Sequence, residues 1–177
     1  MRKLMFTLMA AGSLLTGCQN DSEPPKNAPA PEDRISYTNE EGTLISNGIA
    51  LETRGVKVSR AFLLYDNSTA VPPGNKTTEG RVVRLRLVVD DGWAEKDGRV
   101  SLGASETIRT DKGQVVLDEK DLFADTPLLD ARAARAITLT ATISKLGRRH
   151  NHFVVSFRLW DKRGSGEIRG SYKLVVE

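Results

Sequence analysis

Alternation of apolar and polar residues with a period of two is the feature that most restricts the fold of this 177-residue chain. Side chains that alternate in this way lie on opposite faces of a β-strand. The clearest segment spans residues 81–89, and its inward positions are Val83, Leu85, Leu87 and Val89. Similar patterns recur in three later segments, at residues 137–146, 153–159 and 168–176. The chain is therefore expected to build sheets.

Residues 56–65 form a further expected strand, which is apolar on both faces. Val56, Val58, Phe62 and Leu64 would share one face, and Ala61, Leu63 and Tyr65 the other. Shorter strands are expected at residues 100–102, 107–110 and 114–117, because glycine and aspartate punctuate this region. The run of residues 161–166 contains two glycines and predicts a hairpin between the last two strands.

One helix is expected, over Leu128 to Arg135. Thr126 would cap it and Pro127 would occupy its first position, and the segment that follows is rich in alanine. A single turn over residues 121–123 is expected to place Leu122 and Phe123 in the core.

These elements predict one all-β domain over residues 35–177. Seven or eight short strands with one short crossover helix suggest an immunoglobulin-like antiparallel β-sandwich. A closed β-barrel is the alternative.

The N-terminus has the order of a secretory signal. Arg2 and Lys3 precede an apolar run from Leu4 to Leu15, and small residues then lead to Cys18, the only cysteine. Twelve apolar residues are too few for a lasting membrane span, which takes about twenty. Residues 1–17 are therefore expected to be an export signal.

The segment Leu15-Thr16-Gly17-Cys18 resembles the lipobox of bacterial lipoproteins. The resemblance covers only the first eighteen or so residues. It implies that the thiol of Cys18 receives a diacylglyceryl group, that the bond before it is cut, and that the new amino terminus is acylated. Gln19 stands where an aspartate commonly signals retention in the inner membrane, so the resemblance favours the outer membrane, with the periplasmic or surface face left open. Acylation of Cys18 would leave no thiol for a disulfide.

Residues 18–34 are expected to be a disordered tether that carries the lipid. The segment contains four prolines, and it has no apolar residue larger than alanine after Cys18. It therefore cannot bury enough surface to fold by itself.

The charge of the chain argues against nucleic-acid binding. The net charge is +3, and residues 42–177 hold 22 basic and 17 acidic side chains, which is a modest bias. If the final hairpin pairs as expected, one of its faces presents Arg158, Trp160, Arg169 and Lys173. Arg84 and Arg86 would join them if their strand lay in the same sheet. Such a face could bind an anionic partner, with Trp160 as a stacking plane, or it could simply be a solvated sheet face.

Metal and catalytic motifs are weak. His150 and His152 lack a third ligand nearby, and the loop that holds Asp90, Asp91 and Glu95 does not follow the order of an EF-hand. Gly164-Ser165-Gly166 lacks the spacing of a nucleophile elbow. No metal, cofactor or catalytic residue is predicted.

The leading functional hypothesis is a non-enzymatic exported lipoprotein whose sandwich binds an envelope protein or an anionic glycan. A structural accessory subunit of an envelope complex or surface fibre is the second hypothesis, and a hydrolase-like enzyme is the third.

Overall fold

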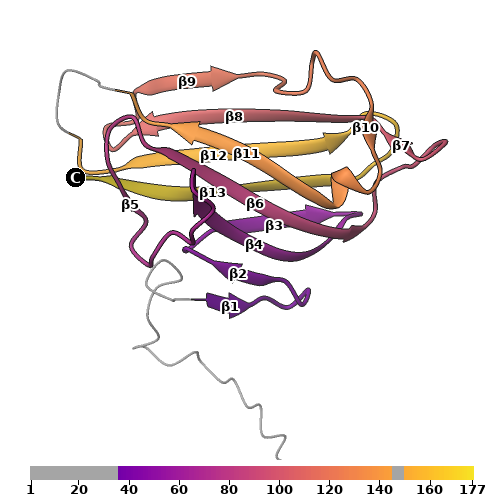
Figure 1. Ribbon diagram of the computed structural model, residues 1–177, viewed down its shortest axis with the longest axis horizontal. Coiled ribbons are helices and arrows are strands. Elements are labelled where there is room, and N and C mark those ends of the chain that lie inside the picture. Colours follow the sequence, from indigo (N-terminus) through magenta and orange to yellow (C-terminus); the bar gives the residue numbers. More distant parts are fainter. Residues whose placement is uncertain (1–35, 145–149) are drawn as a thin grey trace, which may run out of the picture.

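The computed structural model describes residues 36–144 and 150–177, which fold into two packed β-sheets (Figure 1). The first sheet contains, in spatial order, β1 (Ser36–Thr38), β2 (Leu44–Ser46), β4 (Lys57–Tyr65), β6 (Val82–Asp91) and β11 (Ala136–Thr142). The second contains β3 (Ala50–Arg54), β13 (Glu167–Val176), β12 (Phe153–Asp161), β8 (Leu102–Thr110) and β9 (Val115–Glu119). Two short strands, β7 (Arg99–Val100) and β10 (Leu129–Asp130), pair with each other at one end.

The core lies between the two sheets and is built from the inward positions of the longest strands. Leu63, Leu85 and Leu139 contribute from the first sheet, and Leu159 and Leu174 from the second; all five are at most 2 % exposed. The sheets remain separate in the described residues, and none closes into a barrel. Within residues 36–144 and 150–177, eight strands have five or more residues. The expected β-sandwich is therefore confirmed.

The predicted hairpin between the last two strands is also confirmed. β12 and β13 pair antiparallel from Phe153 opposite Leu174 to Trp160 opposite Glu167. Asp161 closes the turn, because its carboxylate accepts the backbone N–H groups of Arg163 and Gly164. Its second oxygen accepts the N–H of Ala94 and so ties the loop after β6 to this turn.

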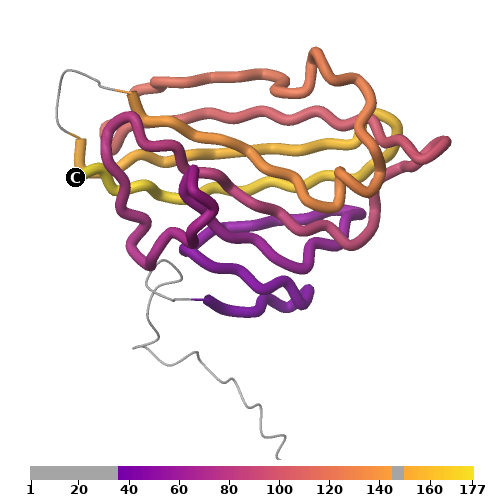
Figure 2. The backbone as a smooth tube through the Cα atoms, in the orientation of Figure 1, coloured from indigo at the N-terminus to yellow at the C-terminus, as the bar shows by residue number. Residues whose placement is uncertain are grey.

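The segment between β4 and β6 loops over the opposite end of the sandwich (Figure 2). It carries β5 (Lys76–Thr77), which pairs in parallel with the end of β13. Asn47 and Asn75 hold this loop in place, since the Nδ2 of Asn47 donates to Oδ1 of Asn75 over 3.0 Å. This loop therefore contacts both sheets.

In β4 the expected alternation is interrupted. The pairing of β4 with β6 shifts register between Val58 and Arg60, which is the mark of a β-bulge. The bulge turns Val58 and Ala61 to the same side, and both are buried, whereas Phe62 is half-buried. The predicted division of this strand into faces is therefore wrong for Val56 and Val58, which belong to the core together with Ala61.

The predicted helix over residues 128–135 is wrong. Leu129 instead pairs with Val100, and only Ala133–Arg135 forms a single 3-10 turn. Asp130 starts this turn, because its carboxylate accepts the N–H groups of Arg132 and Ala133. The segment is too short for helix propensity to overcome these local bonds.

Other local expectations need correction. Leu122 is 42 % exposed rather than buried, although Phe123 packs partly against the core. The strands expected at residues 100–102 and 107–110 are largely one long strand, β8. The strands β1, β2 and β3 were not predicted.

The signal segment, Cys18 and the tether lie outside the described residues, as do the last residues of the strand expected at 137–146. Within the described part of the chain, no helix has the length and hydrophobicity to cross a membrane.

Candidate functional site

Three arginines surround one carboxylate on the outer face of the second sheet. We call Arg54, Arg158, Arg169 and Glu167 the arginine cluster. Alternation in β12 and β13 turns Arg158 and Glu167 away from the core, and Arg158 lies directly opposite Arg169. β3 adds Arg54, which lies directly opposite Glu167. Three neighbouring strands thus bring their charged side chains to one place.

Glu167 is the centre of the arginine cluster, and its side chain is 6 % exposed. Its Oε1 accepts hydrogen bonds from the Nε of Arg158 and from the Nε of Arg169, the latter over 2.7 Å. Its Oε2 accepts from a terminal nitrogen of Arg54 over 2.8 Å. The hydrogen bond from Arg169, together with that from Arg158 and the positive charge of both, lowers the pKa of Glu167 below its usual range. Glu167 therefore stays ionised and positions the arginines.

The arginines themselves remain open to solvent. The side chains of Arg54, Arg158 and Arg169 are 73 %, 48 % and 56 % exposed. Arg158 and Arg169 each donate to Glu167 through Nε alone. Their terminal nitrogens have no hydrogen-bond partner among the described residues. A planar guanidinium that is held at Nε presents its remaining N–H donors in a fixed fork, which suits anionic groups.

Trp160 lies next to the arginine cluster and is held flat against the sheet. It stands opposite Gly103 on β8, and a Cβ atom at Gly103 would overlap the indole. The guanidinium carbon of Arg158 lies 5.1 Å from the centre of the indole. Trp160 and Arg158, which the sequence predicted on one face, therefore do lie together, with Gly103 as the residue that makes room.

A hollow of 170 Å³ lies beside the arginine cluster and is lined by Glu52, Thr53, Arg54, Glu167 and Arg169. Lys173 shares the outer face four residues beyond Arg169 on β13. The opposite charges of Glu52 and Lys173 cancel each other, so these two residues leave the arginine cluster with the net charge of +2 that three arginines and one glutamate give.

Arg84 and Arg86 belong to a different face. Their strand, β6, is in the first sheet, so the condition under which they would join the basic face is not met. Arg86 donates to the hydroxyl of Thr138, and Arg84 donates to the backbone oxygen of Asp66. The predicted set of six residues is thus divided between two sheets.

Arg54 and Glu167 are the site residues that the sequence prediction missed. For Glu167 a signal existed, since it stands two residues before Arg169 and shares its face in any strand. For Arg54 no such signal existed, because its position depends on the pairing of β3 with β13 across 113 residues.

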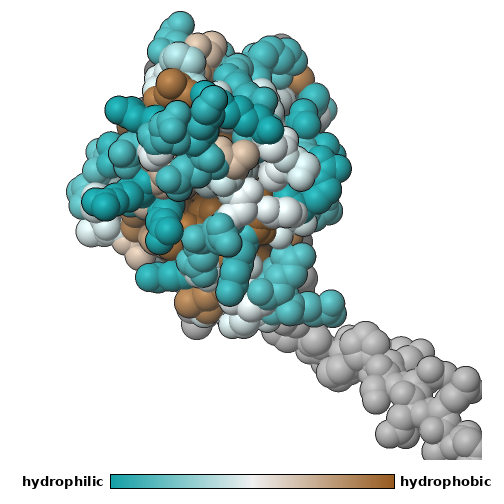
Figure 3. Space-filling model, turned by 90° about the vertical axis from the view of Figure 1, so that its right-hand side faces the viewer, coloured by the Kyte–Doolittle hydropathy of each residue, from teal (hydrophilic) through white to brown (hydrophobic). Residues whose placement is uncertain are grey.

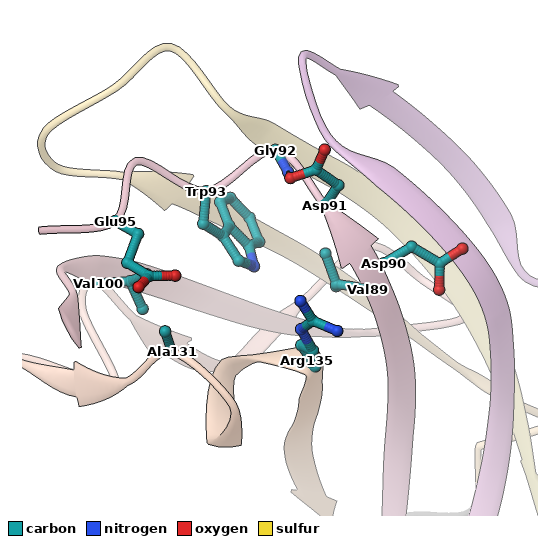
Figure 4. Close-up of a pocket in the computed structure, with 9 residues that line it drawn as sticks. All are labelled: Val89, Asp90, Asp91, Gly92, Trp93, Glu95, Val100, Ala131 and Arg135. Atoms are coloured by element: carbon teal, nitrogen blue, oxygen red, sulfur yellow. The ribbon is translucent and has the colours of Figure 1, made fainter. Parts of the chain in front are cut away.

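A second hollow lies at the end of the sandwich near β7 and β10, where the surface is mostly hydrophilic with hydrophobic residues among the polar ones (Figure 3). Its lining includes Trp93, Glu95 and Arg135, and the guanidinium of Arg135 points toward Trp93 (Figure 4). The Nε1 of Trp93 is buried without a hydrogen-bond partner in the described part of the chain. This hollow has a volume of about 40 Å³, against about 170 Å³ for the hollow at the arginine cluster, so it has less room for a ligand.

The acidic residues of this loop do not converge. Asp91 folds back onto the N–H of Gly92 over 2.7 Å, and Asp90 points away from Trp93 (Figure 4). The weak histidine motif does not form a metal site either, since Nδ1 of His150 lies 3.0 Å from Oδ1 of Asp111. Across the described ranges no group of three or more His, Cys, Asp or Glu side chains is placed to hold a metal ion.

Comparison with known proteins finds no matching family model and no matching curated protein. Among solved structures, the chain is similar to the C-terminal domain of Wzt, with a TM-score of 0.46 and 11% identity over 73% of this chain and 78% of that one. It is also similar to a superoxide reductase (neelaredoxin) from Ignicoccus hospitalis, with a TM-score of 0.36 and 10% identity over 66% of this chain and 80% of that one.

Proposed function

We propose that this chain is an exported, non-enzymatic lipoprotein of the outer membrane, anchored through Cys18, whose β-sandwich binds an anionic group of an envelope glycan or protein. The binding surface is the arginine cluster together with Trp160 and Lys173. The anchor rests on the motif that ends at Cys18, and the binding role rests on the geometry of the cluster.

The observation that carries the binding role is the use of one buried carboxylate to hold three exposed arginines. Solvated surface charges normally spread apart, and an exposed ion pair contributes only about 0 to 1 kcal/mol. Here Arg158 and Arg169 stand directly opposite each other, an arrangement of like charges that is unfavourable in a sheet. Glu167 offsets that cost and leaves the outer donors free for a ligand.

The test is capture of the purified full chain, extracted in mild detergent, on beads that carry heparin or polygalacturonate. The variant Arg158→Gln/Arg169→Gln is expected to lose most of the capture at low salt, because it removes two of the three guanidinium groups of the arginine cluster. Screening should weaken capture of the wild-type protein as salt rises above about 0.1 M.

A matched control is Arg84→Gln/Arg86→Gln, which removes the same charge from the other sheet. This control should be captured like the wild-type protein, and thermal unfolding should show that both variants fold. Equal capture of all three proteins would mean that the outer face is only a solvated surface.

A further inference from the structure

The arginine cluster has a geometry that narrows the kind of anion it can take. Both Arg158 and Arg169 donate their Nε to the same atom, Oε1 of Glu167. The two guanidinium groups therefore meet at one oxygen atom, and their terminal nitrogens donate no hydrogen bond to Glu167. Arg54 approaches the other oxygen of Glu167, so a third group borders the same spot.

The charge of the cluster distinguishes between anions. Three guanidinium groups and one carboxylate leave a net charge of +2. A phosphomonoester carries a charge of about −1.5 to −2 near pH 7 and three acceptor oxygens. A carboxylate carries only one negative charge and two oxygens, so it would leave one positive charge and several donors unused.

We infer that the anionic group bound here is a phosphomonoester on a saccharide, held by the terminal nitrogens of Arg158 and Arg169. This inference rests on the proposed function and names its ligand. Trp160 stands directly opposite Glu167 in the hairpin, and the guanidinium of Arg158 lies over its indole. It supplies an apolar surface for the sugar ring that carries the phosphate.

Binding should therefore follow the second ionisation of the phosphate, which has a pKa of about 6. The groups of the protein that face the ligand are the three arginines, Lys173, Glu52 and Glu167, and Ser105 on β8. Guanidinium groups are not deprotonated in proteins, and the pKa of Glu167 is lowered by Arg169 and Arg158. His152 lies six residues from Arg158, about 20 Å along the strand. Glu106, whose pKa is raised to about 7 by burial, faces the core from β8 and not the ligand. A pH dependence that glucose 6-phosphate shows and glucuronate does not is therefore assigned to the phosphate.

The experiment measures how well four soluble probes bind to the full chain extracted in mild detergent: glucose 6-phosphate, glucuronate, glucose and inorganic phosphate. At pH 7 glucose 6-phosphate should bind at least tenfold more tightly than glucuronate, and more tightly than inorganic phosphate. Lowering the pH to 5 should weaken the affinity for glucose 6-phosphate by up to about tenfold, because the population of the phosphate dianion falls by about that factor. The affinity for glucuronate should not change. Arg158→Gln/Arg169→Gln should remove the preference, and Arg84→Gln/Arg86→Gln should keep it.

Equal affinity for glucose 6-phosphate and glucuronate would overturn the phosphate assignment and leave the proposed binding of acidic glycans standing. Binding to vesicles that contain phosphatidic acid, without binding to glucose 6-phosphate, would overturn the saccharide assignment in favour of a lipid headgroup. If none of the anionic probes binds and the heparin and polygalacturonate beads capture nothing, the proposed function fails as well.

Discussion

The carboxyl group of Glu106 lies in an environment that disfavours its charged form. It lies on the inward side of β8, its residue is 2 % exposed, and one of its carboxyl oxygens is buried without a hydrogen-bond partner in the described residues. Burial raises the pKa of Glu106 to about 7. Burial likewise raises the pKa of nearby Tyr172 well above its usual range. The core therefore favours the neutral form of Glu106.

This raised pKa predicts the direction in which pH changes stability. A carboxyl group whose pKa is higher in the folded state binds its proton more tightly there, so the free energy of unfolding falls as the pH rises from about 4.5 to 7. The loss amounts to about 3 kcal/mol and levels off above pH 7. The variant Glu106→Gln should lose this dependence and be more stable than the wild-type protein at pH 8, as measured by urea unfolding at several pH values.

Glu119, exposed and directly opposite Glu106 on β9, provides the matched control. Glu119→Gln makes the same change in charge and should retain the wild-type pH profile. The carboxyl groups whose pKa is lowered, such as Asp111 beside His150, lose their contribution only at lower pH. A Glu106→Gln variant that is less stable than the wild-type protein at pH 8 would contradict this account.

Asn47 and Asn75 connect elements that are far apart in the chain. Asn47 has a φ of 62° and Asn75 a φ of 50°, in the left-handed region that asparagine tolerates better than most residues. The side chain of Asn47 donates to the backbone oxygen of Val71 and accepts the N–H of Leu63. Asn75 donates to the backbone oxygens of Asn47 and Lys173. The pair thus joins β4, β13 and the loop that bears β5.

Asn47→Ala should lower the free energy of unfolding by about 3 kcal/mol or more. It leaves several buried groups unsatisfied, each costing about 1 to 3 kcal/mol, and it places alanine in a left-handed conformation. Asn67 also accepts hydrogen bonds from its neighbour Thr69, but at an exposed turn. Asn67→Ala should cost less than about 1 kcal/mol, and equal losses for the two variants in chemical denaturation would contradict the role of the pair.

The strands with strict alternation were predictable because their pattern reports burial directly. β6, β11, β12 and β13 bury the residues that the sequence indicated, including Leu85, Leu139 and Leu159. The bulge in β4 was not predictable, because a single extra residue changes the face without changing the composition. The helix prediction failed at Asp130, where one side chain bonds the backbone locally. A local hydrogen bond of this kind offers the backbone an alternative to the helix.

The basic face was predictable only in part, for a related reason. The turn at Asp161 fixes the pairing of β12 with β13, and this places Arg158 beside Arg169 from local sequence. The participation of Arg54, and the separation of Arg84 and Arg86 into the other sheet, depend on which strands lie side by side. That order is set by packing across the whole domain rather than by any local pattern.

In the whole molecule, the proposed lipid on Cys18 would connect a membrane to a folded domain whose outer face carries the arginine cluster. The tether expected between them, residues 18–34, lies outside the described residues and stays a prediction. An acyl chain contributes about 0.8 kcal/mol for each buried methylene, so more than one chain gives stable anchoring.

The anchor predicts the outcome of replacing Cys18. The variant Cys18→Ser should not be labelled by a fatty-acid probe in growing cells, because serine offers no thiol for the lipid. It should also no longer be recovered in the membrane fraction. Its matched control is Ser22→Ala, a change in the same segment that leaves the cysteine in place. Unchanged fatty-acid labelling of Cys18→Ser would contradict the anchor.

The arginine cluster is the surface where we propose that this protein binds its anionic ligand. The most direct test of this proposal is nuclear magnetic resonance of the arginine Nε–H groups during titration with glucose 6-phosphate. The account predicts that the signals of Arg158, Arg169 and Arg54 shift in a saturable way while those of Arg84 and Arg86 stay in place. Saturable shifts confined to Arg84 and Arg86, or no saturable shift in any arginine, would contradict it.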